Sequence, residues 1–102
     1  MLWYEYVACF FAGLFLANAV PHFVNGVSGD PFPTPFAHPP GKGLSSPLVN
    51  VLWALLNTII GCWLFHAGKV SSGELPILAV FFTGVAAISL MLSVHFAGKD
   101  SR

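Results

Sequence analysis

Hydrophobic residues fill three long runs of the chain, and the charged residues lie only between and outside these runs. Residues 6–29, 43–68 and 75–98 contain no Asp, Glu, Lys or Arg. Each run exceeds the ~20 residues that a helix needs to cross the hydrocarbon core of a bilayer. A soluble helical protein would carry a charged face along each helix, and these runs carry none. The pattern predicts an all-α membrane protein with three transmembrane helices.

We expect a single transmembrane domain over residues 1–102, with helices at about residues 2–21, 47–66 and 75–97. The first helix is expected to end near Pro21, because proline removes a backbone donor and clashes with the preceding turn. Ser46 and Pro47 are a good N-cap and a good first-turn residue for the second helix.

The segment between the first two predicted helices, residues 22–46, has a different composition. Six of the eight prolines lie between Pro31 and Pro47. The sequence PFPTPF, from Pro31 to Phe36, favours an extended, polyproline-like backbone. Its phenylalanines would not remain in water, so we predict a structured Pro/Phe-rich loop that covers one end of the bundle.

Composition supports a membrane location and limits the partners. Hydrophobic residues make up 56% of the chain and charged residues 8%, whereas soluble domains carry roughly a quarter charged residues. The formal net charge is zero and no basic stripe is present, so nucleic acid is not an expected partner. Three helices bury little surface within one subunit. We therefore expect the lipid bilayer as a partner, together with a homo-oligomer or a larger membrane complex.

Small and polar residues form stripes on two of the predicted helices. Asn57 and Gly61 lie on one face of the second helix, and Ala79 and Thr83 are four residues apart on the third. Asparagine is costly against lipid, and small residues allow close helix approach. These four residues are the predicted helix–helix interface.

Polar residues also concentrate at the end of the bundle where the loop lies. The first helix ends there, the second begins there and the third ends there. This topology predicts a polar pocket under the loop, formed by Asn18, His22, Asn25, Asp30, Asn50 and His95.

Three functional interpretations remain open. The first is a non-enzymatic module for binding, small-solute permeation or assembly of a membrane complex, which needs no cofactor. The second is a redox protein with haem or a metal, for which His22, His38 and His95 are the candidate ligands. No pair of these histidines has ligand spacing such as H-x-x-x-H. The third is a membrane enzyme using Asp30 and His22.

Enzymatic function is the least favoured of the three. The chain contains no nucleophile-elbow, P-loop, Rossmann or H-E-x-x-H pattern, and we predict no catalytic residue.

Glu5, near the start of the first helix, has two interpretations. The carboxylate can extend to the lipid headgroups beside Trp3 and Tyr4, where the helix dipole favours a negative charge. It can instead form a proton or cation site within the membrane. Its position so near the helix end favours the first interpretation.

The motifs PHFVNGVSGDPFPTPFA (Pro21–Ala37) and GLSSPLVNVLW (Gly43–Trp53) resemble a family of small bacterial integral-membrane proteins without an assigned activity. The resemblance covers about Phe10 to Trp63 and implies a bacterial inner (plasma) membrane protein. It supplies no catalytic or binding residues. Lys42, Lys99 and Arg102 lie on the loop side and Lys69 on the other, so the positive-inside rule predicts an external N-terminus and a cytoplasmic C-terminus.

Overall fold

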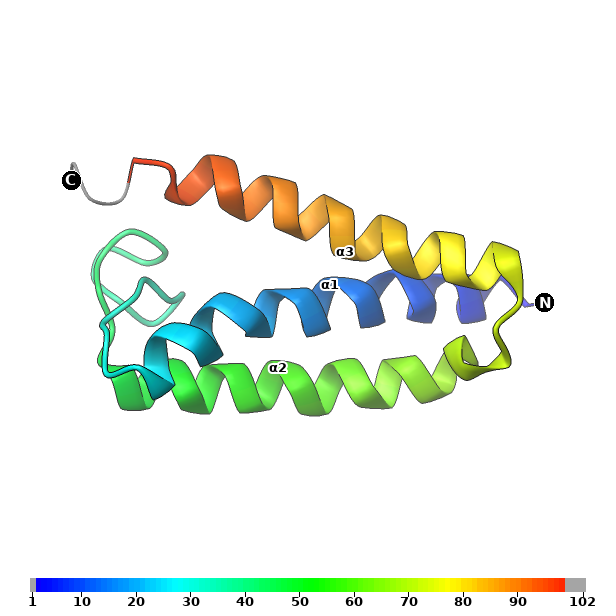
Figure 1. The fold of residues 1–102 in the computed structure, drawn as a ribbon, viewed down its shortest axis with the longest axis horizontal. Helices are drawn as coiled ribbons and strands as arrows, with labels where there is room; N and C mark the ends of the chain where they lie inside the picture. Colours follow the sequence, from blue (N-terminus) through cyan, green and yellow to red (C-terminus); the bar gives the residue numbers. More distant parts are fainter. Residues whose placement is uncertain (1, 99–102) are drawn as a thin grey trace.

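The computed structural model describes residues 2–98 as three long helices joined by one long and one short connection (Figure 1). The helices are α1 (Trp3–Val27), α2 (Pro47–Ala67) and α3 (Leu75–Phe96), and a short 3-10 helix, η1 (Val70–Ser72), connects the last two. Within residues 2–98 no β-strand forms, and Phe32 and Ser45 make one isolated bridge. All three long helices are long and apolar enough to cross a membrane. The predicted fold class, an all-α membrane protein with three spans, is confirmed.

Helix α1 is the central element of the bundle. It packs against both α2 and α3, which make few contacts with each other. Large apolar side chains cover the outer surfaces, among them Ile59, Phe82 and Val94, each more than half exposed. An outer surface of this kind is stable in lipid and unfavourable in water. The molecule is 44 Å along its longest axis, enough to cross a bilayer core of about 30 Å.

Helix α1 continues to Val27, six residues beyond the end expected at about residue 21. Pro21 lies inside the helix, where the sequence analysis placed a helix end. Membrane helices tolerate proline because neighbouring groups satisfy the freed backbone. The carbonyl that Pro21 frees is that of Ala17, four residues earlier. Separately, the amide of Asn25 donates to the backbone oxygen of Pro21 at 2.7 Å, within the same helix. The loop between α1 and α2 is consequently shorter than predicted, at residues 28–46.

Two glycines allow α1 and α3 to approach at the level of their backbones. A Cβ atom added to Gly84 would overlap the backbone oxygen of Phe10, and one added to Gly13 would overlap the backbone oxygen of Phe81. Without these glycines the two helices would have to move apart. Close backbone approach at small residues is a common way for membrane helices to associate.

The predicted interface residues lie in two different environments. Asn57 is buried against α1, where its Oδ1 accepts a hydrogen bond from the amide of Asn18 at 3.0 Å. Gly61 is buried next to Leu16 of α1. Ala79 and Thr83 lie on an exposed face of α3, and the hydroxyl of Thr83 donates to the backbone oxygen of Ala79. These two residues therefore face away from the interfaces within one chain and are accessible to a partner.

Replacing Gly84 with alanine should destabilise the bundle. The new methyl group would meet the Phe10 backbone, which cannot move aside as a flexible side chain can. We expect the free energy of unfolding in detergent to fall by about 1–3 kcal/mol, the usual cost of overpacking. Ser89→Ala, on the exposed face of the same helix, is the matched control and should have little effect. Equal stability of the two variants would show that α1 and α3 do not pack at Gly84.

Candidate functional site

The loop of residues 28–46 folds as a cap over the end of the bundle where α1 ends, α2 begins and α3 ends (Figure 1). Its two arms are joined by reciprocal backbone hydrogen bonds between Phe32 and Ser45, at 3.0 and 3.2 Å. The hydroxyl groups of Thr34 and Ser45 form a further bond at 2.5 Å. The backbone oxygen of Thr34 accepts from the N–H groups of Ala37 and Gly41. These bonds give the proline-rich loop a defined shape.

Asn50, in the first turns of α2, fixes the cap to the helices. Its side-chain nitrogen lies 2.9 Å from the backbone oxygen of Phe32, 3.2 Å from that of Ser45 and 3.0 Å from that of Ser46. The side chain is fully buried. A buried amide without partners would be strongly unfavourable in an apolar surrounding. The cap therefore supplies the acceptors that Asn50 needs inside the membrane protein.

The partners of Asn50 determine the tautomer of His22 on α1. Because three carbonyl oxygens surround the Asn50 nitrogen, its Oδ1 must be the atom that faces Nδ1 of His22, at 2.8 Å. An amide oxygen only accepts, so Nδ1 of His22 carries the proton and donates. In the neutral ring, Nε2 then bears a lone pair. Nε2 of His22 forms no hydrogen bond within residues 2–98.

Helix α3 is joined to the cap by His95. Its Nε2 donates to the backbone oxygen of Gly41 at 2.7 Å. Phe32 is buried between the ends of the helices, where its ring packs edge-on against His22 at 5.4 Å and Phe96 at 4.7 Å. All three helices thus contact the cap through a polar or aromatic side chain.

A cavity of about 280 Å³ lies between the cap and the three helices. Helix α3 contributes the largest share of the helical residues, and the loop supplies prolines and a threonine. The lining residues are Asn18, His22, Pro33, Thr34, Pro35, Gly41, Trp53, Met91, Leu92, His95 and Phe96. Most of this wall is apolar, with a few polar atoms, which is the usual composition of a small-molecule site.

Two polar atoms at this cavity lack a partner among the described residues. Nε1 of Trp53 is a buried donor without a hydrogen bond. Nε2 of His22 is the acceptor identified above, and the two rings pack edge-on at 6.5 Å. A group that both donates and accepts, such as a hydroxyl, matches this pair.

The structure brings together only part of the predicted pocket. Asn18, His22 and His95 line the cavity, and Asn50 lies behind His22. Asn25 and Asp30 do not line it. Because α1 continues to Val27, Asn25 stays on the helix and its side chain donates to the backbone oxygen of Pro21. Asp30 lies exposed after the end of the helix.

The candidate metal ligands are also divided. His22 and His95 share the cavity, whereas His38 lies exposed on the loop and is not part of the lining. Within residues 2–98 no group of three or more His, Cys, Asp or Glu side chains is placed to hold a metal ion. A protein-only metal cage is therefore not formed by the described residues.

Trp53 and Thr34 are two polar site residues that were not predicted from the sequence. Trp53 is three residues after Asn50, so the two share a helix face, and this spacing is a signal that could have identified Trp53. Thr34 carried no such signal, because its position depends on how the loop folds back to Ser45.

Comparison with family models, curated proteins and solved structures found no match to this chain.

Substituting Asn50 with leucine should loosen the cap. The change removes the donor to the loop carbonyls and the acceptor for His22, and leaves these buried groups without partners. We expect the free energy of unfolding to fall by about 2–3 kcal/mol. Hydrogen exchange at the N–H groups of Ser45 and Gly41 should become faster. Asn25→Leu is the control, since Asn25 binds only its own helix. Unchanged exchange in Asn50→Leu would contradict the role of Asn50 in holding the cap.

Proposed function

We propose that this small multi-pass membrane protein is a non-enzymatic binding module of the bacterial inner membrane. Its ligand is a small, mostly apolar molecule with one hydroxyl group, held in the cavity beneath the cap. The observation that carries the proposal is a pair of residues lining a largely apolar cavity, Trp53 and His22, whose Nε1 and Nε2 atoms have no hydrogen-bond partner among the described residues. The buried N–H of Trp53 is unfavourable until an acceptor binds it.

Each part of the hydroxyl group has a partner in this arrangement. The hydroxyl oxygen accepts from the Trp53 indole, and its hydrogen is donated to the His22 imidazole. The apolar body of the ligand lies against Met91, Leu92 and Phe96. The cavity is several times larger than the ~30 Å³ that one water molecule occupies in the liquid.

Binding is favoured over permeation through a single chain. Backbone contacts at Gly13 and Gly84 bring α1 and α3 together below the cavity. A solute that entered under the cap would meet this tight contact before it reached the other end. An assembly role is compatible with the same site, because Ala79 and Thr83 remain exposed on α3.

Trp53→Phe should reduce ligand binding without unfolding the protein. It preserves an aromatic ring and removes the unpaired N–H together with part of the indole volume, so the free energy of unfolding should fall only slightly. We expect about a fivefold to tenfold loss of bound ligand, the value of one hydrogen bond. Native mass spectrometry and solvent extraction of protein purified in mild detergent would measure this loss.

The matched control is Trp63→Phe on the exposed face of α2. Equal ligand content in the two variants, or no co-purified molecule in the wild-type protein, would contradict the proposed binding function.

The alternative is a haem or metal protein, because His22 and His95 line the same cavity. His95 donates through Nε2 to Gly41, so Nε2 of His22 is the better placed ligand atom. Visible absorption spectra of the oxidised and reduced protein, with metal analysis of the same sample, separate the two functions. We expect a colourless, metal-free protein. A stoichiometric haem band or metal content would replace the proposed function with a redox function.

A further inference from the structure

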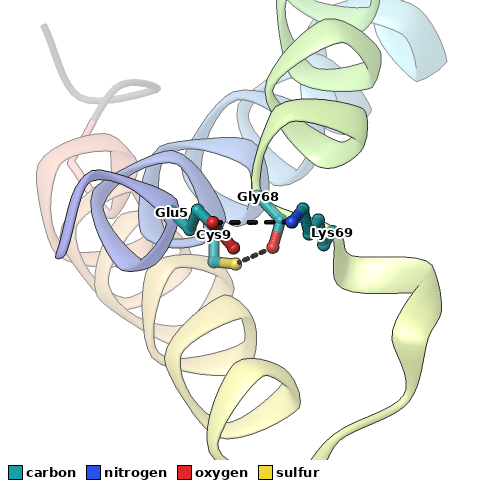
Figure 2. A network of polar contacts seen from close by, with 4 residues as sticks. All are labelled: Glu5, Cys9, Gly68 and Lys69. Atoms are coloured by element: carbon teal, nitrogen blue, oxygen red, sulfur yellow. Dashed lines mark hydrogen bonds and ion pairs between the residues drawn. The ribbon is translucent and has the colours of Figure 1, made fainter. Parts of the chain in front are cut away.

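A second polar site lies at the opposite end of the bundle, where α1 begins and α2 ends (Figure 2). Glu5 is only 5% exposed, so the expectation that its carboxylate extends outward to the headgroups is wrong. Instead, Glu5 lies beneath the turn that follows α2. Its Oε1 is 3.6 Å from Nζ of Lys69, which is an ion pair and too long for a good hydrogen bond. Its Oε2 is buried and has no hydrogen-bond partner among the described residues.

Close packing at the end of α2 holds Glu5 in this position. A Cβ atom on Gly68 would come within 2.8 Å of the Cys9 nitrogen and 3.1 Å of the Glu5 backbone oxygen. The Cys9 thiol donates to the Gly68 backbone oxygen at 2.9 Å (Figure 2). Lys69 then adopts the left-handed conformation, with φ 55°, and its side chain turns back over Glu5. The first turns of α1 are thus packed closely against the turn that follows α2.

A hollow of about 260 Å³ adjoins the carboxylate. It is lined by Leu2, Glu5, Lys69, Ser72 and Glu74. Two acidic residues and one lysine line the same space, and the Lys69 side chain is 66% exposed. A buried carboxylate with one long ion pair lacks the hydrogen bonds that normally compensate for its desolvation. The site is therefore short of N–H or O–H donors.

The hollow lies at the depth of the lipid headgroups. It adjoins the first turn of α1, where Trp3 and Tyr4 are exposed, and aromatic residues of this kind concentrate at the membrane–water interface. The polar groups most abundant at this depth of a bilayer are the headgroups of phospholipids.

We propose that this hollow binds the headgroup of an aminophospholipid such as phosphatidylethanolamine. The primary ammonium of the lipid donates to the carboxylates of Glu5 and Glu74. Lys69 moves off Glu5 and pairs with the lipid phosphate. One cation replaces another at Glu5, so the buried carboxylate keeps a counter-charge and gains hydrogen bonds from an N–H donor.

Charge and hydrogen bonding distinguish this ligand from two others. A phosphatidylcholine headgroup has the same charges, but its trimethylammonium carries no N–H to donate. A divalent cation would use the two carboxylates and would be repelled by Lys69, which lies in the site. The site is separate from the cavity beneath the cap, so this inference does not depend on the proposed function.

The experiment measures lipid binding to the purified full-length chain by native mass spectrometry. Phosphatidylethanolamine, phosphatidylcholine and phosphatidylglycerol with identical acyl chains are the probes. We expect about a fivefold or greater preference of the wild-type protein for phosphatidylethanolamine over phosphatidylcholine. Glu5→Gln and Glu74→Gln should each reduce this preference toward one. Asp30→Asn, an exposed carboxylate at the other end, is the control and should retain it.

Glu5→Gln also removes a buried ion pair, so its effect on lipid binding could come from a change in the fold. Glu74 is exposed, so Glu74→Gln avoids this problem and is the decisive variant. A wild-type protein without preference between the two lipids would overturn the proposal. An unchanged preference in Glu74→Gln would do the same, as would loss of the lipid on addition of equimolar Mg²⁺ or Ca²⁺.

Free phosphoethanolamine in millimolar excess should displace only a small fraction of the lipid. Full displacement would assign the site to a soluble ligand instead.

Discussion

The hydrogen-bonding requirement of one buried amide, Asn50, determines how the loop end of this protein is arranged. Inside a membrane protein no solvent satisfies a polar side chain, so its partners must come from the chain itself. The Asn50 nitrogen is surrounded by backbone oxygens of Phe32, Ser45 and Ser46, and its oxygen accepts a hydrogen bond from His22. The cap, the start of α2 and the tautomer of His22 therefore depend on one another. This coupling also directs the remaining lone pair of His22 away from Asn50.

The two ends of the bundle handle buried polar groups in different ways. At the loop end, Asn18, Asn50 and Asn57 are paired, and the unpaired atoms lie at a cavity. At the other end, the carboxylate of Glu5 has, among the described residues, one long ion pair to an exposed lysine beside a polar hollow. Between them, α1 and α3 meet at the backbones of Gly13 and Gly84. A tightly packed middle with open polar sites at both ends is suited to binding, because each site is held by rigid helices.

Only part of the site could be predicted from the sequence. Depth along each helix follows from residue number, so the placement of Asn18, His22, Asn50 and His95 at the loop end was predictable. Depth does not determine which side chains meet. Asn25 was placed in the pocket from its depth at the loop end, whereas in the structure its side chain binds the backbone oxygen of Pro21 on the same helix. Glu5 was expected to reach the headgroups, and the turn at Gly68 and Lys69 covers it instead.

The sequence by itself determined the three spans, the start of α2 and the structured character of the loop. These features depend on local properties: the length of uncharged runs, a Ser-Pro cap, and prolines interleaved with phenylalanines. Only the tertiary structure decided the path of the cap, the partners of Asn50, the exposure of Ala79 and Thr83, and the burial of Glu5. Each of these depends on contacts between residues far apart in the chain. Their geometry is set by helix packing and by the need to pair buried polar groups, which no local pattern encodes.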